Sequence, residues 1–303
     1  MNGRQRFLQS VFNLRDWLVA QTLFLSLKAL RMVPMDTSIR LFERMARWLG
    51  PKLGRHRVAM DNLAIAFPEK STAEREKIAL DSWAQMARGI AEYGYLDQVF
   101  DLDENNLDAG RIEVKGVENF LKLRDDDLPA IIFTGHLGNF ELLPMAAAKF
   151  GLEIQSLFRA PNNKYAAARI AAARKQVSGN LVASGRGASF QLMRALEKGD
   201  HVGVLVDQKF RRGIEVSFFG QSAPTNTLLA KLARRYNCPV HGARSIRLPN
   251  GRFRLEVTDE LSLPRTGEGD IDIRGTTELI TRVVEGWVRE YPEQWLWIHR
   301  RWG

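Results

Sequence analysis

The sequence lacks several features that would assign a function directly. Its 303 residues contain a single cysteine, Cys238, which excludes an internal disulfide and a zinc site built from several thiolates. The chain contains no Walker A loop, no dinucleotide-binding glycine fingerprint and no Gly-x-Ser-x-Gly nucleophile elbow. His201, His241 and His299 are too dispersed for a metal-ligand motif, so we expect neither a metal nor a cofactor.

The N-terminal region lacks a charge-free run long enough to cross a membrane. Residues 17–27 are uncharged, but Asp16 and Lys28 flank them, whereas a transmembrane helix needs about 20 apolar residues. Arginines among apolar residues instead favour a basic helix on a membrane surface, and snorkelling of Lys28 and Arg31 leaves deeper insertion open. Packing of the same helix on the protein's own core is an equal alternative.

The charge balance is strongly positive. The chain has 44 lysines and arginines against 35 acidic residues, a formal charge of +9. This favours acidic partners, such as nucleic acid, anionic lipid, a phosphorylated substrate or an acidic carrier protein. Charge alone does not choose among them, and a solvated basic surface gives the same number.

The spacing of apolar residues changes near residue 111. Residues 36–110 have helical spacing, with a capping box at 71–74 that starts a long helix toward Phe100, and we expect a helical region packed on the core. Residues 111–303 alternate short apolar runs with helical segments, which predicts an α/β core with a mixed, largely parallel sheet flanked by helices. The expected strands are 130–133, 154–158, 202–206, 240–246 and 253–257. The expected helices are 140–150, 164–177, 189–197 and 227–236.

One stretch carries the clearest chemical signal. The apolar run 130–133 breaks at Gly135, His136 follows it, and a carboxylate, Glu141, comes five residues later. His136 and Glu141 can converge only if the histidine lies in a loop and the glutamate one turn into the next helix. Histidine moves protons near neutral pH, and a carboxylate can fix its tautomer and stabilise the imidazolium. The stretch predicts a base–orienter pair, with a helix cap or a structural histidine as the alternative.

Other polar residues follow the ends of expected strands and form the rest of the predicted site: Arg159, Asp207, Gln208, Lys209 and Arg211. Arg159 could hold a phosphate or stabilise an oxyanion. Lys209 and Arg211 could bind a phosphorylated sugar, whereas Asp207 is expected to orient a cation or bind a sugar hydroxyl. Each cluster is also compatible with an exposed polar turn.

The C-terminal tail is rich in tryptophan and arginine. Trp287, Trp295, Trp297 and Trp302 lie among basic residues. This composition suits a lipid headgroup interface, base stacking on nucleic acid, or a packed C-terminus.

Taken together, these residues resemble a known enzyme family. His136 and Glu141 have the spacing of the His-x4-Asp/Glu motif of glycerolipid-type acyltransferases. More narrowly, the chain resembles the lipid A biosynthesis acyltransferases, the lauroyl/myristoyl family of Gram-negative bacteria. The stretches that carry the narrower resemblance are Asn62-Leu63, Phe67-Pro68-Glu69, residues 135–141, Phe158-Arg159, Asp207-Gln208, Phe219-Gly220 and residues 291–302.

The resemblance implies transfer of a fatty acyl chain from an acyl carrier protein thioester to a hydroxyl of a phosphorylated lipid A precursor. It implies that His136 is the general base and that Glu141 orients it. It also implies attachment of residues 1–35 to the cytoplasmic face of the inner membrane, with no nucleic acid as partner. Residues 218–220 would form a loop that lines an acyl-chain cleft or simply packs on the core.

Two alternatives stay open. The nearer one is an acyltransferase that acts on another glycolipid or on a glycerophosphate. The glycerophosphate motif prefers asparagine before the histidine and a terminal aspartate, whereas this chain has Gly135 and Glu141. The more distant alternative is a non-enzymatic basic protein that binds membranes or nucleic acid.

Overall fold

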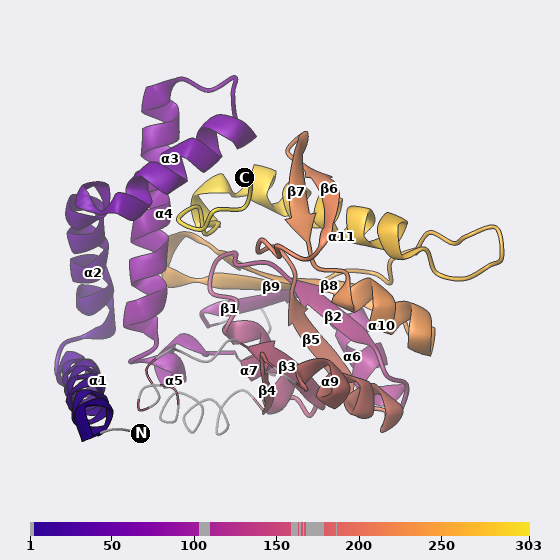
Figure 1. The fold of residues 1–303 in the computed structure, drawn as a ribbon, viewed down its shortest axis with the longest axis horizontal. Coiled ribbons are helices and arrows are strands. Elements are labelled where there is room, and N and C mark those ends of the chain that lie inside the picture. Colours follow the sequence, from indigo (N-terminus) through magenta and orange to yellow (C-terminus); the bar gives the residue numbers. More distant parts are fainter. Residues whose placement is uncertain are drawn as a thin grey trace.

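The computed structural model describes the backbone of residues 3–102, 110–158, 163, 165, 167, 179–185 and 187–303, and side chains from residue 13 onward except 23 and 27. Arg159 and most of the expected helix 164–177 lie outside the described residues. The described part consists of an N-terminal group of helices beside an α/β core (Figure 1).

The N-terminal helices form one side of the molecule, with α4 between α2 and the sheet (Figure 1). They are α1 (Gly3–Leu30), α2 (Met35–Leu49), α3 (Gly54–Ala66), α4 (Thr72–Glu92) and α5 (Leu96–Val99). The predicted capping box is confirmed, because the Ser71 hydroxyl and the Glu74 carboxylate each accept a hydrogen bond from the other residue's backbone N–H. Among the described helices, none combines the length and apolar character needed to cross a bilayer.

The expected long helix toward Phe100 is interrupted after Glu92. The chain turns at Gly94, and the buried Tyr95 hydroxyl hydrogen-bonds the backbone carbonyl of Val33 at 2.8 Å. Ser38 of α2 also contacts this hydroxyl, at 2.8 Å. The turn places Tyr95 against the start of α2. This tertiary contact cannot be predicted from helical spacing.

Seven of the described strands form one sheet, in the order β1-β9-β8-β2-β5-β3-β4. Only β8 and β9 pair antiparallel within this sheet, so the predicted mixed, largely parallel sheet is confirmed. The bounds are β1 (Ile112–Lys115), β2 (Ile131–Thr134), β3 (Ile154–Phe158), β4 (Asn180–Ala183), β5 (His201–Leu205), β8 (Val240–Arg247) and β9 (Phe253–Val257).

Both faces of the sheet are covered by helices. Successive side chains of a strand alternate between faces, and Ile131 and Phe133 of β2 share a core cluster with residues of α9 (Ala188–Glu197), α10 (Leu228–Tyr236) and α11 (Ile273–Glu290). Ile132 belongs to a second cluster, with residues next to and within α6 (Val117–Asp125) and α7 (Leu142–Lys149). Burial on both faces explains why β2 reads as a continuous apolar run.

A separate hairpin carries the stretch that was expected to be a loop. Strands β6 (Ile214–Phe218) and β7 (Gln221–Thr225) are joined by Phe219 and Gly220, both at positive φ, as a two-residue turn of type I′ requires. Phe218 stacks on Trp302 with ring centroids 5.4 Å apart. The residues that line the apolar cavity described below do not include this turn. Phe218 and Phe219 therefore pack in the core and do not line that cavity.

Candidate active site

The register of β2 and β5 brings His136 and Asp207 together. The two strands are parallel neighbours, and Thr134 is the partner of Leu205 at their carboxyl ends. His136 and Asp207 each lie two residues beyond this pair. The carboxyl ends of parallel strands are where α/β folds place their sites. The Nδ1 atom of His136 lies 2.7 Å from Oδ1 of Asp207.

The hydrogen bonds on the imidazole fix its tautomer. An ionised carboxylate only accepts, so Nδ1 carries a proton that it donates to Asp207. The other ring nitrogen, Nε2, accepts a hydrogen bond from the side-chain amide of Gln208 at 3.1 Å. Nε2 therefore carries the lone pair, as a general base must, and this lone pair is directed at the Gln208 amide.

Asp207 is held as a carboxylate by its surroundings. Its side chain is 1% exposed, and it also accepts hydrogen bonds from the His136 backbone N–H and from the Trp295 indole, both at 2.7 Å. Burial alone would raise the pKa of Asp207, but the positive charge that His136 carries when it is protonated and these hydrogen bonds outweigh it and hold the pKa at about 2. Asp207 is thus ionised throughout the physiological pH range.

A buried cation lies beside this pair. Arg301 is 2% exposed and donates to the carbonyl of Pro224 and to the Thr225 hydroxyl. Burial lowers the pKa of Arg301 to about 10, against the opposing effect of Asp207 and Glu215, so the guanidinium stays charged at neutral pH. The hollow that His136 and Arg301 line has a volume of about 10 Å³, which is room for one oxygen-sized group.

The loop that carries His136 is fastened to the C-terminal tail. Leu137 forms an antiparallel bridge with Trp295, and the Gly138 N–H donates to the carbonyl of Gln294. Gly138 has a φ of +57°, and a Cβ there would lie 2.2 Å from the carbonyl oxygen of Ser245. Glycine is therefore required at this position, both for the backbone conformation and for the close approach to β8.

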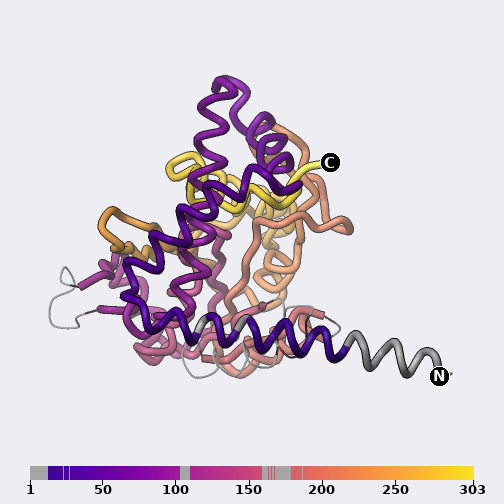
Figure 2. The backbone as a smooth tube through the Cα atoms, turned by 90° about the vertical axis from the view of Figure 1, so that its left-hand side faces the viewer, coloured from indigo at the N-terminus to yellow at the C-terminus, as the bar shows by residue number. Residues whose placement is uncertain are grey.

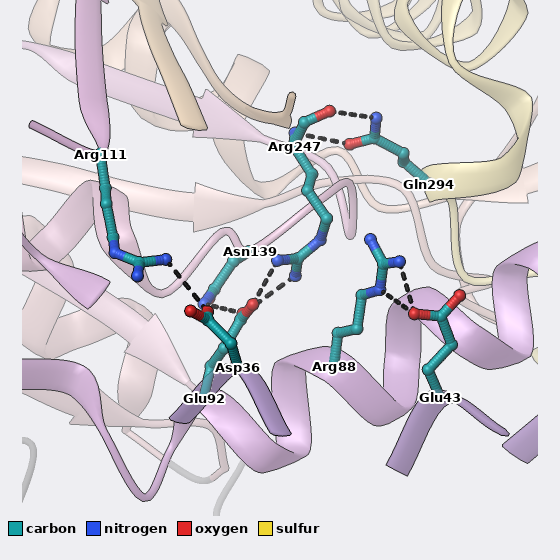
Figure 3. A network of polar contacts seen from close by, with 8 residues as sticks. All are labelled: Asp36, Glu43, Arg88, Glu92, Arg111, Asn139, Arg247 and Gln294. Carbon is teal, nitrogen blue, oxygen red and sulfur yellow. Dashed lines mark hydrogen bonds and ion pairs between the residues drawn. The ribbon is translucent and has the colours of Figure 1, made fainter. Parts of the chain in front are cut away.

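A buried ion pair anchors the next residue of the loop (Figure 3). Glu92 of α4 and Arg247 of β8 form a bidentate pair, and the Asn139 side chain donates to the same carboxylate at 2.8 Å. The Gln294 side chain exchanges two hydrogen bonds with the Arg247 backbone. These contacts tie the helical region, the sheet and the tail to the loop of His136.

An apolar cavity of about 410 Å³ adjoins the loop, between the sheet and helices α6 and α7. Its lining includes residues at the carboxyl ends of three neighbouring strands: Thr134, Phe158 and Leu205. Phe140 also lines it and packs edge-on against the His136 ring, with centroids 5.1 Å apart. The volume is within the range of ligand pockets, which are apolar with few polar groups.

The comparison with known proteins assigns the family. A profile described as "Bacterial lipid A biosynthesis acyltransferase" matches residues 4–303. The chain belongs to this family. The resemblance seen in the sequence is thereby confirmed, and membership supports acyl transfer in lipid A biosynthesis as the reaction class.

Individual relatives are distant. The chain is 23% identical to "Lipid A biosynthesis palmitoleoyltransferase" of Escherichia coli (strain K12) over 253 residues, 82% of this chain and 78% of that protein. A "Lipid A biosynthesis acyltransferase" of Shigella flexneri matches to the same extent. A "Lipid A biosynthesis lauroyltransferase" of Escherichia coli (strain K12) is 24% identical over 269 residues.

Within this acyltransferase fold, the predicted site residues separate into groups. His136, Asp207, Gln208 and Lys209 line one hollow. Glu141 instead lines the apolar cavity, and the ring nitrogens of His136 contact Asp207 and Gln208. The carboxylate found on Nδ1 thus comes from the connection after β5, not from the start of the following helix. Arg211 is exposed and is not among the described residues that line either space.

The packed C-terminus is the alternative that the structure bears out, but the sequence interpretation gave the tail no part in the site. Trp295 and Arg301 line the hollow beside His136, and Trp287, Trp297 and Trp302 are also buried. Because these rings are buried, they are not available for base stacking or for contact with a lipid interface. A signal was present, because residues 291–302 carried part of the family resemblance. In the parts of the chain that the structure describes, no three metal-ligating side chains gather at a possible metal site.

Proposed function

We propose that the protein transfers a fatty acyl chain from an acyl carrier protein thioester to a hydroxyl of a lipid A precursor. The observation that carries this proposal is the oriented base, His136 with Asp207, at the edge of an apolar cavity of about 410 Å³. The cavity suits an acyl chain, and the base suits a hydroxyl acceptor.

In the proposed mechanism, the acceptor hydroxyl replaces the Gln208 amide at Nε2 of His136. Nε2 takes the hydroxyl proton while the acceptor oxygen attacks the thioester carbonyl carbon. The tetrahedral intermediate then expels the carrier thiolate, which receives the proton from His136. The new ester bond replaces the thioester bond, and no group stays on the enzyme.

Asp207 takes the orienting role in this mechanism. It holds the Nδ1–H tautomer and stabilises the imidazolium that forms when Nε2 is protonated. General-base assistance of this kind is worth roughly 10²–10⁴ in rate. Glu141, at the wall of the cavity, is proposed to contact substrate there, where its carboxylate can accept a hydrogen bond from the acceptor.

The basic residues near the hollow are proposed to hold the phosphorylated acceptor. Lys209 lines the hollow, and Arg211 is exposed on the same connection after β5. Arg159, which follows β3, is proposed for the same task or for the oxyanion. With residues 1–35 attached to the inner membrane, the site would face the cytoplasm, where both the carrier protein and the acceptor lipid are available.

The test is mass spectrometry of a lipid A precursor after incubation with the purified protein and a mixture of acyl carrier protein thioesters. The proposal expects one added acyl mass. Parallel reactions with coenzyme A thioesters, and with glycerol 3-phosphate as acceptor, test the donor and the nearer alternative. Acylation of glycerol 3-phosphate with an unchanged lipid A precursor would overturn the assignment of the acceptor.

A further inference from the structure

Helix α2 has an apolar outer face that nothing in the described structure covers. Leu41, Met45 and Trp48 are spaced at i, i+4 and i+7, which places them on one side of the helix. Their exposed fractions are 53%, 47% and 64%. The opposite side, with Ile39, Glu43 and Ala46, is half-buried and faces α4, where Glu43 pairs with Arg88. The exposure therefore belongs to a continuous stripe and not to scattered single residues.

The surroundings of this stripe are basic. Arg40 and Arg44 are exposed on α2, and the ammonium of Lys52 lies 3.5 Å from the centroid of the Trp48 ring. The acidic residues of α2 are engaged elsewhere, Glu43 with Arg88 and Asp36 with Arg111. Apolar side chains that end in a tryptophan, with cations at the margin, match the headgroup region of an anionic bilayer.

The stripe continues toward α1. The connection between the helices exposes Met32 and Val33, and α1 exposes Leu14, Leu18 and Leu25. Figure 2 looks at this side of the molecule, with α1 and α2 nearest the viewer. Both helices lie on the side of the protein away from the sheet (Figure 1), and both have exposed apolar side chains.

We infer that the outer face of α2, defined by Leu41, Met45 and Trp48, lies on an anionic lipid bilayer. The N-terminal attachment is then a two-helix surface, and α2 fixes the angle at which the α/β core stands on the membrane. This inference does not depend on the acyl-transfer reaction. Either claim, membrane contact by α2 or acyl transfer, can fail while the other holds.

The single native cysteine makes a direct test practical. Cys238 is buried, and burial raises the pKa of its thiol to about 11, so a maleimide dye at neutral pH will label an introduced surface cysteine instead. Full-length Met45→Cys carries the dye on α2, and Ser217→Cys carries it on the exposed side of β6 as the control. The vesicles contain phosphatidylethanolamine and phosphatidylglycerol, with or without spin-labelled acyl chains as quenchers.

On vesicle-bound protein, we expect the dye at position 45 to be quenched by the spin-labelled chains and shielded from iodide. The dye at position 217 should show the reverse. Bound protein whose position-45 dye stays open to iodide would overturn the inference, and so would the absence of vesicle binding. Shielding without vesicles, rising with protein concentration, would show that a second copy covers the face, which also overturns it.

A matched pair of double variants gives a second readout by co-sedimentation. Leu41→Ser with Trp48→Ser removes two side chains of the stripe, whereas Leu128→Ser with Phe190→Ser removes two residues of similar exposure on the α/β core. We expect the first pair to lower vesicle affinity by roughly tenfold or more, because binding scales with buried apolar area. Equal affinity of the two double variants would contradict the inference.

Discussion

The indole Nε1 of Trp295 donates a hydrogen bond of 2.7 Å to Oδ2 of Asp207, across 88 residues of sequence. The same carboxylate accepts from the His136 ring through its other oxygen. The tail therefore completes the shell around the proposed orienter. Trp295 contacts the site from inside the protein, and all four tryptophans of residues 287–302 are buried.

Trp295→Phe should lower kcat while the protein stays folded. The substitution keeps most of the packing but removes one hydrogen bond to a buried charge, which is worth about 1.5–3 kcal/mol, or roughly tenfold to hundredfold in rate. Trp302→Phe is the control, because its indole donates to the backbone carbonyl of Phe218 and not to the site. Steady-state kinetics of both variants make the comparison, and an equal loss in the two would count against a role for Trp295.

Asp207→Asn should cost far more activity than Glu141→Gln. The first change removes the charge that holds the Nδ1–H tautomer, with an expected loss of roughly 10²–10⁴ in kcat. The second leaves the imidazole hydrogen bonds in place, so we expect its effect chiefly on KM. If Glu141→Gln instead removed turnover and Asp207→Asn did not, the orienter would be Glu141, as the sequence alone suggested.

The Asp207 substitution also has a stability signature. The pKa of Asp207 in the folded protein, about 2, is below its ordinary value of 3.8. The ionised carboxylate therefore adds stability that is fully present above about pH 4 and is lost as the pH falls toward 2. Urea unfolding should show the gap between wild type and Asp207→Asn shrinking on acidification, by an amount on the order of 2 kcal/mol.

Glu92→Gln should destabilise the fold by roughly 3–5 kcal/mol, because it leaves the buried Arg247 guanidinium without its carboxylate. Asp36→Asn is a matched control from the same region of Figure 3. Its partner, Arg111, is 3.5 Å away and both side chains are more exposed, so about 0–1 kcal/mol is expected. Denaturant unfolding of the two variants tests this, and similar losses would refute the assigned importance of the buried pair.

Ala147→Phe should reduce transfer of long acyl chains more than of short ones. Ala147 of α7 lines the apolar cavity, and a phenyl ring there occupies space that the proposed acyl chain needs. We expect kcat/KM for the longest accepted donor to fall by about tenfold or more. Ser262→Phe is the control, since Ser262 lines a separate hollow beside Cys238 and His241. A uniform effect across donor lengths would place the acyl chain elsewhere.

Much of the sheet could be predicted because its central strands are buried on both faces. The expected strand 253–257 matches β9 residue for residue, and 130–133 differs from β2 by one position at each end. Strands β1 and β4 were not predicted. They lie at the two edges of the sheet, and β4 has a single fully buried residue, Val182, so neither strand has a continuous apolar run.

The site was harder to predict than the strands that carry it. Sequence placed His136 and Asp207 each at the carboxyl end of a strand, but the order of strands within a sheet is set by long-range packing. Without knowing that β2 and β5 are neighbours, the nearest carboxylate in sequence, Glu141, was the natural partner. For the same reason, the place of Arg301 in the site could not be predicted, because it depends on how the tail folds back on the hairpin of β6 and β7.

The most direct test of the account compares His136→Ala with His299→Ala in the mass-spectrometric acylation assay. Both histidines lie at the same hollow, and Asp207 holds the ring of His136 as an oriented base. We predict that His136→Ala loses roughly 10²–10⁴ of the initial rate with its thermal unfolding still cooperative, and that His299→Ala stays within a few-fold of wild type. Wild-type turnover by a folded His136→Ala protein would contradict the central claim.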